Sequence, residues 1–274
     1  MALFECAAKL FGKAEEESGA AVASGGPLIS FEHVSIGFDG RAVLDDVSFE
    51  VQRGETLCIL GRSGVGKSVA LRLLMGFLKP DAGSIRVENA EIDTMGEDGL
   101  REIRKKVTMV FQNGALFDSL SVRENIAFPL RERGGLNEDE ILAKVDRLMA
   151  MVGVESSADA LPSSLATGYK RAVAMARALA ASPEIVLYDE PTTMVDPIIA
   201  RRMGDLIEQM KQQFCLTSIV VTHDMRFAKR LADRILFLAE GKAHYFGPTE
   251  EFVSSQDTLI RQFLSLDAYR LPAA

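Results

Sequence analysis

The sequence predicts an α/β fold in which a largely parallel sheet is covered by helices on both faces. Apolar, β-branched runs alternate with a segment of helical period where "IVLYDE", "ARRMGDLIEQMKQQF" and "TSIVVTHD" follow one another. A glycine-rich stretch, "GRSGVGKS", separates the apolar run "ETLCIL" from the leucine-rich run "VALRLLMGFL". A strand, a loop and a helix in this order are typical of parallel α/β sheets. The 274 residues are sufficient for one large domain with a buried core.

The chain is expected to have three parts: an N-terminal arm (1–27), a main domain (28–250) and a C-terminal helical extension (251–274). The arm begins with apolar residues at helical spacing in "MALFECAAKLFGK" and continues into the small, acidic, glycine-rich stretch "AEEESGAAVASGGP". The stretch predicts a flexible linker. Two interpretations of the helix stay open, a frayed terminus and a helix that binds a membrane surface or a partner. The chain contains no run of 18 apolar residues, so we expect no membrane span.

The main domain opens with a predicted hairpin. The segments "LISFEHVSIGF" and "RAVLDDVSFEV" alternate with period two around Asp39-Gly40, a strong turn signal. A buried strand over 56–60 precedes the glycine-rich loop, and the helix after that loop is expected to end at Pro80. Further strands are predicted at "GSIRVEN" and "VTMVFQ".

Helical period dominates residues 120–182, with loops at "RGGL" and "ESSADALPSS". The segment "RILFLAEGKAHYFG" predicts a last hairpin. Apolar residues at helical spacing continue in the extension, where we expect them to pack against their own domain. An alternative is that the extension reaches a second protomer.

The glycine-rich stretch fits the phosphate-loop pattern Gly61-x-x-x-x-Gly66-Lys67-Ser68. Glycines let consecutive backbone N–H groups turn toward phosphate oxygens, and the following helix adds its positive end. Lys67 would reach the β- and γ-phosphates, and the Ser68 hydroxyl would ligate Mg²⁺. Kinase, GTPase and ATPase all remain open at this point. The expected nucleotide-binding residues of the loop are Gly61, Arg62, Ser63, Gly64, Val65, Gly66, Lys67, Ser68 and Val69.

Polar side chains also follow three other predicted strands. Asp189 and Glu190 end "EIVLYDE", His223 follows "SIVVT", and Gln112 ends "VTMVFQ". The carboxyl ends of parallel strands meet at the ligand edge of a sheet. We therefore expect Asp189 to hold Mg²⁺ through water and Glu190 to act as general base. His223 would lie at the γ-phosphate, and Gln112 would contact Mg²⁺ or the attacking water.

The order of phosphate loop, Gln112, helical insert, Asp189-Glu190, "TTMVD" and His223 resembles the nucleotide-binding domain of ATP-binding cassette (ABC) transporters. The resemblance covers nearly all of residues 28–250. It implies a RecA-like P-loop NTPase core, an antiparallel β subdomain and an inserted helical subdomain at about residues 115–182. It also implies ATP and Mg²⁺ as cofactors, and a homodimer in which each ATP lies between one protomer's phosphate loop and the other's signature motif. Catalysis would then fall to Glu190, His223 and Lys67.

The same resemblance assigns further residues. Phe38 would stack on adenine, although a core role for it stays open, and Asp196 would line the dimer interface. The signature motif, usually Leu-Ser-Gly-Gly-Gln, departs here and is formed by Leu165, Ala166, Thr167, Gly168 and Tyr169. Position 166 lacks a hydroxyl and position 167 carries a side chain where glycine is usual. We expect a slower ATPase, with a nucleotide-sensing subunit of poor turnover as the alternative.

The wording "FQNGALFDSLSV" and "FPLRE" resembles the ATPase subunit of bacterial mammalian-cell-entry and maintenance-of-lipid-asymmetry (MCE/Mla) lipid transport systems. This resemblance implies two integral-membrane permease subunits, MCE-type lipid-binding proteins and an accessory cytosolic subunit as partners. It also implies a peripheral location on the cytoplasmic face of the bacterial inner membrane. Apolar residues after Gln112 would form a groove for a helix of the permease, or would close the core of the helical subdomain.

Other classes fit less well. An importer ATPase for an amino acid or another small solute would share every catalytic motif and stays open. The net charge of -8 argues against a nucleic-acid partner. DNA-repair ATPases of this kind need long heptad segments, and translation-associated cassette proteins carry two cassettes and basic segments. Neither feature is evident in this sequence.

Overall fold

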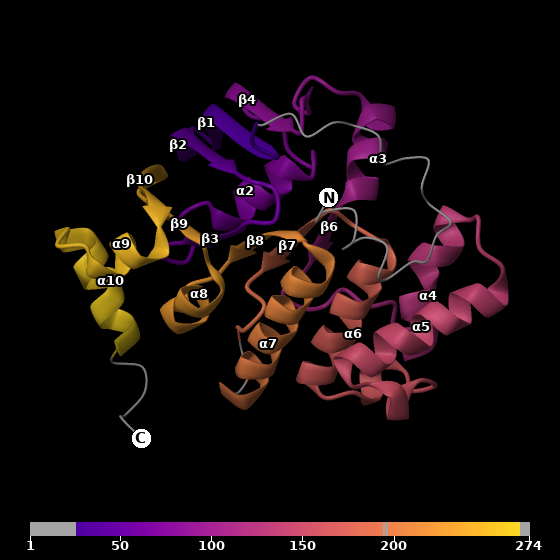
Figure 1. The fold of residues 1–274 in the computed structure, drawn as a ribbon. Helices are drawn as coiled ribbons and strands as arrows, with labels where there is room; N and C mark the ends of the chain where they lie inside the picture. The colour runs from indigo at the N-terminus through magenta and orange to yellow at the C-terminus, as the bar shows by residue number, and fades with distance from the viewer. Residues whose placement is uncertain (1–25, 194, 196, 269–274) are drawn as a thin grey trace. The chain divides into compact units, whose positions relative to one another are not determined.

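The computed structural model describes residues 26–193, 195 and 197–268 (Figure 1). The chain forms two compact units, which we describe separately. Unit 1 holds residues 105–216, and unit 2 holds residues 26–104 and 217 onward. The helix and the linker expected in residues 1–25 lie outside the described residues, as does Asp196.

The first part of unit 2 is an antiparallel sheet. Its strands are β1 (Ile29–Phe38), β2 (Arg41–Val51), β4 (Ala82–Val87) and β5 (Ala90–Glu91), in the order β2-β1-β4-β5. The predicted hairpin is confirmed, because β1 pairs with β2 around Asp39 and Gly40, whose φ angles are 52° and 74°. Two consecutive positive φ angles are what a tight hairpin turn of right-handed twist requires.

The second part of unit 2 is built on parallel strands. β3 (Thr56–Leu60) pairs in parallel with β8 (Thr217–Val221) and β9 (Arg234–Ala239), and β10 (Lys242–Pro248) runs antiparallel to β9. Every residue of β3 and β8 is buried, as strands covered on both faces require. The short helix α8 (Met225–Leu231) connects β8 to β9. The predicted last hairpin, β9–β10, is confirmed.

The helix after the glycine-rich loop, α2 (Lys67–Leu74), ends earlier than expected. The prediction that Pro80 ends it is wrong. Its last turn closes when the N–H of Gly76 bonds to the Leu73 carbonyl, with Gly76 at a φ of 66°. A side chain on Gly76 would also stand 2.5 Å from Leu100 of α3 (Glu97–Lys106). Packing against α3 therefore explains this end of the helix better than the proline does.

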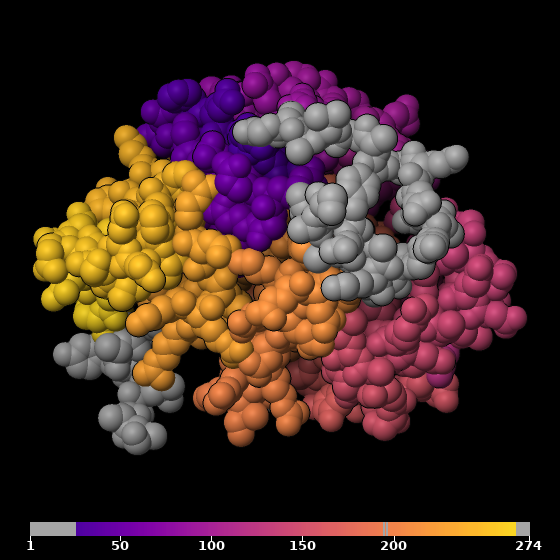
Figure 2. Space-filling view, viewed as in Figure 1, coloured from indigo at the N-terminus to yellow at the C-terminus, as the bar shows by residue number. Residues whose placement is uncertain are grey.

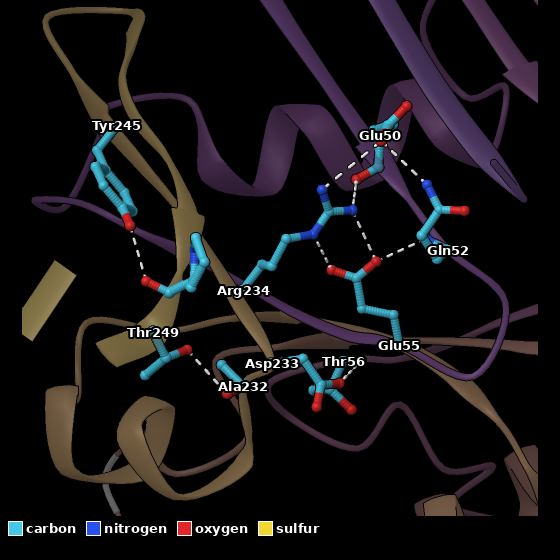
Figure 3. A network of polar contacts seen from close by, with 10 residues as sticks. Glu50, Gln52, Glu55, Thr56, Ala232, Asp233, Arg234, Tyr245 and Thr249 are labelled. Carbon is cyan, nitrogen blue, oxygen red and sulfur yellow. Dashed lines mark hydrogen bonds and ion pairs between the residues drawn. The ribbon is translucent and has the colours of Figure 1, made fainter. Parts of the chain in front are cut away.

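An ion-pair network connects β2, β9 and Glu55, the residue before β3, within unit 2 (Figure 3). The Arg234 guanidinium donates to both carboxylate oxygens of Glu55, at 2.5 and 2.8 Å, and to the Glu50 carbonyl at 2.8 Å. Its Cζ lies 4.6 Å from the centroid of the Phe246 ring. Glu55 is only 7% exposed, so its carboxylate is largely removed from water. The Arg234 guanidinium supplies the opposite charge and the hydrogen bonds that such a carboxylate needs.

The C-terminal helices α9 (Thr249–Ser254) and α10 (Thr258–Ala268) pack on the β9–β10 hairpin. The ring of Phe237 lies 5.5 Å from that of Phe252 and 5.0 Å from that of Phe263. In Figure 2 the atoms of α9 and α10, in yellow, adjoin those of the hairpin, in orange. The expectation that this segment packs against its own chain is therefore confirmed for Phe252 and Phe263, while Leu266 is 54% exposed.

Unit 1 contains two parallel strands, β6 (Val107–Val110) and β7 (Ile185–Asp189), and a group of helices. The helices are α4 (Val122–Arg133), α5 (Glu138–Val152), α6 (Thr167–Ala180) and α7 (Pro197–Phe214). The helices α4 and α5 each begin with a capping box, formed by Ser121 with Glu124 and by Asn137 with Glu140. The predicted loops after α4 and α5 are confirmed, the second with two short 3₁₀ turns at Glu155–Ser157 and Pro162–Ser164.

None of the helices in the described residues combines the length and the apolar character that a membrane span requires.

Candidate functional site

The glycine-rich loop of unit 2 has the geometry of a phosphate cradle. Gly61 directly follows β3 and has a φ of 154°, and Gly66 precedes α2 with a φ of 107°. A Cβ atom on Gly61 would stand 2.6 Å from the Leu238 carbonyl oxygen, and one on Gly66 would stand 2.9 Å from the Val43 carbonyl oxygen. Neither position accepts a side chain, because the contacted atoms belong to backbone. The loop therefore packs closely against its neighbours and leads directly into the N-terminus of α2.

Lys67 opens α2 and is only 6% exposed. Its Nζ donates to the carbonyl oxygens of Gly61 at 2.9 Å and Arg62 at 3.1 Å. The ammonium group thus lies inside the curve of the loop. A phosphate in the cradle would meet this positive charge together with the backbone N–H groups of the helix start.

His223 lies at the same edge of unit 2 as the loop. Ile59 of β3 is in register with Val221 of β8, and the N–H of Thr222 donates to the Ile59 carbonyl at 3.2 Å. His223 therefore lies two residues beyond the end of β8, at the edge where the loop follows β3. Asp224 follows and caps α8 by accepting bonds from the N–H groups of Arg226 and Phe227.

Phe38 ends β1 in unit 2 and is 43% exposed. This exposure is inconsistent with the core role that the sequence left open. Stacking on adenine therefore stays the prediction for this exposed ring, and a bound nucleotide is needed to test it.

Unit 1 brings the remaining strand-end residues to one edge. Val110 of β6 is in register with Tyr188 of β7. Asp189 and Glu190 follow Tyr188, and Gln112 lies two residues beyond Val110, in a turn closed by the N–H of Gly114 and the Phe111 carbonyl at 2.9 Å. Gln112 is exposed, and Asp189 and Glu190 are half-buried. Gln112, Asp189 and Glu190 thus follow two paired strand ends at the carboxyl edge of this unit.

The loop after β7 holds Glu190 in an unusual conformation. Its φ is 49°, a region that residues other than glycine seldom occupy. The N–H of Thr193 donates to the Glu190 carbonyl at 3.2 Å, which closes a turn with Pro191 at its second position. The Thr193 hydroxyl lies 2.8 Å from Glu190 Oε2.

The sequence 165–169 lies at the start of α6. Ala166 is the N-cap residue and provides no side-chain bond to the helix, whereas Thr167 and Tyr169 are exposed. Gly168 is closely packed, because a Cβ atom there would stand 2.9 Å from Ile199 Cγ2 of α7. The glycine that this stretch shares with the usual signature thus has a packing role within unit 1.

Comparison with known proteins identifies the family of this chain. A profile described as ABC transporter matches residues 44–193, more than half of the chain. The chain belongs to the ABC transporter family. The methionine import ATP-binding protein MetN of Brucella abortus (strain 2308) is 36% identical over 92% of this chain and 68% of its own length. The intermembrane phospholipid transport ATP-binding protein MlaF of Haemophilus influenzae is 36% identical over 86% of this chain and 90% of its own length.

A solved structure supports the fold and the activity. The dimeric ATP-binding cassette MJ0796, in a post-hydrolysis state bound to ADP and Pi, aligns with a TM-score of 0.74 at 29% identity, over 81% of this chain and 98% of that one. The predicted ABC ATPase fold, with its antiparallel β subdomain and helical subdomain, is confirmed. The protein is an ABC ATPase that binds and hydrolyses ATP, and it is the ATPase subunit of an ABC transporter.

The residues expected to bind Mg²⁺ in this ABC ATPase are Ser68 in unit 2, and Gln112 and Asp189 in unit 1. They offer a hydroxyl, an amide and a carboxylate oxygen, the hard donors that Mg²⁺ prefers. No cluster of three or more His, Cys, Asp or Glu side chains suited to a metal occurs in the described part of the chain. Magnesium bound with a nucleotide needs few protein ligands because phosphates and water supply the others, so the donor set fits the ion.

Sequence reasoning missed two arginines of the signature helix in this ABC ATPase. Arg171 donates to the carbonyl oxygens of Pro191 and Thr193, in the loop after β7. Arg177 donates to the Gly114 carbonyl at 3.2 Å and lies 5.5 Å from the Phe117 ring, in the loop after β6. Burial lowers the pKa of both guanidinium groups.

A signal for these arginines is present in the wording "TGYKRAVAMARALA". From Ala172 onward, alanine, valine, methionine and leucine occupy every position of this stretch except Arg177, and a helical segment with so few polar residues is buried. A buried arginine needs hydrogen-bond partners, so the pattern indicates that both positions bind polar groups from other segments.

Proposed function

We propose that this ABC ATPase acts as a homodimer with two permease subunits on the cytoplasmic face of a bacterial inner membrane, and that it drives lipid transport. Closure of the dimer on ATP would move the permease, and hydrolysis would reset it. Glu190 activates the attacking water, while Lys67 and His223 stabilise the transferring phosphoryl group. The partners would include MCE-type lipid-binding proteins and an accessory cytosolic subunit.

The phosphate loop holds the nucleotide in this proposal. Backbone N–H groups of residues 61–69 bind the phosphates, and Phe38 stacks on adenine. Ser68, Gln112 and Asp189 hold Mg²⁺, which neutralises charge on the phosphates. The exposure of Phe38 and the enclosed position of Lys67 support these roles.

The signature motif supplies the opposing wall of the site in the partner protomer. Ala166 has no hydroxyl to donate to the γ-phosphate, but Thr167 stands exposed at the first position of α6 and Gly168 keeps the helix start close to α7. A hydrogen bond to a charged group contributes about 1.5–3 kcal/mol, so its loss predicts a slower enzyme and not an inactive one. Asp196 is assigned to the same dimer interface.

One observation carries the lipid proposal: the segment shared with MCE/Mla ATPases places an aromatic pair on the surface of unit 1. The rings of Phe117 and Phe128 lie 4.7 Å apart and remain 43% and 37% exposed. Such a pair suits the apolar face of a permease helix. The similarity to MlaF, which is named for phospholipid transport, points in the same direction.

A second candidate function is import of an amino acid. The similarity to MetN, a methionine import protein, is equal in percentage identity and favours this alternative. Both candidates share the ATPase machinery. Transport of the cargo itself therefore has to separate them.

The test uses the whole complex, isolated from membranes by a tag on this chain and reconstituted into phospholipid vesicles. We expect ATP turnover and ATP-dependent movement of labelled phospholipid, both lost in Glu190→Gln, whose turnover should fall by about 1,000-fold because the general base is gone. Arg147→Met, which alters an exposed arginine of α5, is the matched control and should behave like the natural protein. ATP-dependent uptake of methionine without lipid movement would replace the lipid proposal with the importer.

A further inference from the structure

Glu190 occupies a backbone conformation that must be maintained by its surroundings. A positive φ at a non-glycine residue costs free energy, and such conformations persist where neighbouring groups fix them. Glu190, with its φ of 49°, directly precedes Pro191, and the ring of Pro191 fixes the φ angle of that residue. The groups that hold this loop therefore decide where the Glu190 carboxylate points.

The side chain of Arg171 in α6 binds this loop from outside it. It is 5% exposed, and its two terminal nitrogens donate separately to the carbonyl oxygens of Pro191 and Thr193. The planar fork of a guanidinium fixes two acceptors in one geometry, which an ammonium group does not do. Its pKa is lowered by burial, so the chain keeps a desolvated charge at this position at a cost.

Thr193 extends the connection to the carboxylate. Its carbonyl accepts from Arg171, and its hydroxyl lies 2.8 Å from Glu190 Oε2. An ionised carboxylate only accepts hydrogen bonds, so the hydroxyl donates to it. Arg171, the Thr193 backbone, the Thr193 hydroxyl and Glu190 thus form one continuous series of contacts within unit 1.

We propose that Arg171 is a positioning residue for ATP hydrolysis, which acts on Glu190 through the loop 190–193 and the Thr193 hydroxyl. This inference rests on the proposed role of Glu190 as general base. Arg171 stands about one helical turn after Thr167, so the helix that begins with the signature motif also sets the orientation of the base in its own protomer.

The test measures steady-state ATP turnover and ATP affinity of the full chain in its complex. Arg171→Met should lower kcat by about 100-fold, because a displacement of the base by 1 Å is costly, while KM and ATP affinity stay unchanged. Arg171→Lys, which keeps the charge but reaches one carbonyl, should lose about tenfold. Thr193→Val should also lower kcat by about tenfold, whereas Thr193→Ser, which keeps the hydroxyl, should keep the kcat of the natural protein. Arg147→Met is again the control, since it removes an exposed arginine from the same unit.

The double variant Arg171→Met with Glu190→Gln separates positioning from general damage. If Arg171 acts through Glu190, the double variant turns over ATP at the rate of Glu190→Gln alone. A normal kcat in Arg171→Met and Thr193→Val, or a raised KM with kcat intact, would overturn the positioning role. Full turnover in Glu190→Gln would instead overturn the proposed base. If Arg171→Met does not fold, Arg171→Lys and the two Thr193 variants decide in the same way.

Discussion

Arg171 in unit 1 is buried and Arg234 in unit 2 is partly buried, and their partners differ. Arg234 faces the Glu55 carboxylate with bidentate geometry, and this hydrogen bonding raises its pKa. Arg171 donates to two backbone carbonyls, and burial lowers its pKa. A guanidinium paired with a carboxylate holds its charge easily and connects distant strands. One that binds carbonyls keeps a less favourable charge in order to fix a loop.

The two units therefore use charged side chains in different ways. In unit 2 the network of Figure 3 joins residues about 180 positions apart in the sequence, as between Glu55 and Arg234. In unit 1 the contact joins a helix to the loop that carries Glu190. We therefore expect substitutions in the first network to change stability and substitutions in the second to change turnover.

The largest effect on stability is expected for Arg234→Met. Removing one partner of a buried pair leaves Glu55, which is 7% exposed, with an uncompensated charge. The free energy of unfolding should fall by about 3 kcal/mol, with kcat of the folded protein unchanged. Urea unfolding followed by circular dichroism measures the first quantity, and turnover at low temperature measures the second.

Arg53→Met is the matched control for Arg234→Met. Arg53 pairs with Glu88 at 3.1 Å in the same unit, but the two side chains are 43% and 34% exposed. Its loss should cost less than about 1 kcal/mol. If Arg234→Met lowered kcat and left the unfolding midpoint in place, the contrast between the two arginines would be wrong.

A smaller effect is expected for Asn125→Leu in unit 1. Asn125 is fully buried in α4, where its Oδ1 accepts from the Phe117 N–H at 2.9 Å and its Nδ2 donates to the Leu120 carbonyl at 3.0 Å. Unpaired backbone groups in the loop 117–121 should lower the free energy of unfolding by about 2 kcal/mol. Because these hydrogen bonds go to the loop before α4 and not to the Glu190 loop, ATP affinity and kcat should not change.

The substitution Ser121→Ala, which removes the cap of the same helix, sets the scale at about 1 kcal/mol. If Asn125→Leu lowered kcat and left the unfolding midpoint unchanged, the assignment of Asn125 to stability and of Arg171 to turnover would be wrong. Calorimetry and turnover on the same preparations give both quantities.

Much of this architecture was predictable because the signals are local. Asp39-Gly40 between alternating strands specifies a hairpin, and the spacing of Gly61, Gly66 and Lys67 specifies the loop between β3 and α2. Strand-end positions predicted the placement of Asp189 and His223. Each of these follows from residues close together in the sequence.

What the sequence did not reveal depends on contacts between distant segments. Arg171 meets Pro191 and Thr193 only because α6 packs beside the loop after β7, and no spacing in the sequence encodes that meeting. The end of α2 was misplaced for the same reason, since the fit of Gly76 against Leu100 decides it, and not Pro80. Local patterns give elements and motifs, whereas packing gives the partners of buried polar groups.

The smallest effect is expected for an exposed pair in unit 2, Asp257 and His244. Asp257 accepts from the N–H groups of Leu259 and Ile260 at the start of α10, and it lies 3.1 Å from His244 Nε2. The bond from the Ile260 N–H and the contact with His244 lower the pKa of Asp257. The ionised form is therefore favoured in the folded chain. The stabilisation that the Asp257 carboxylate gives the folded chain is complete above the usual pKa of an aspartate. It is lost as the pH falls through the lowered pKa of Asp257.

Below about pH 4, α10 should therefore exchange its amide hydrogens faster than the rest of unit 2, since aspartates titrate in this region. Asp257→Asn should show the faster exchange at neutral pH already, with little further change on acidification. Asp139→Asn, at an exposed position of α5 in unit 1, is the control for charge removal alone. Equal acid sensitivity in the natural protein and in Asp257→Asn would exclude this carboxylate as the origin. Because an exposed charge is screened by water, the effect should remain local to α10, which is the behaviour that separates it from the buried pair at Arg234.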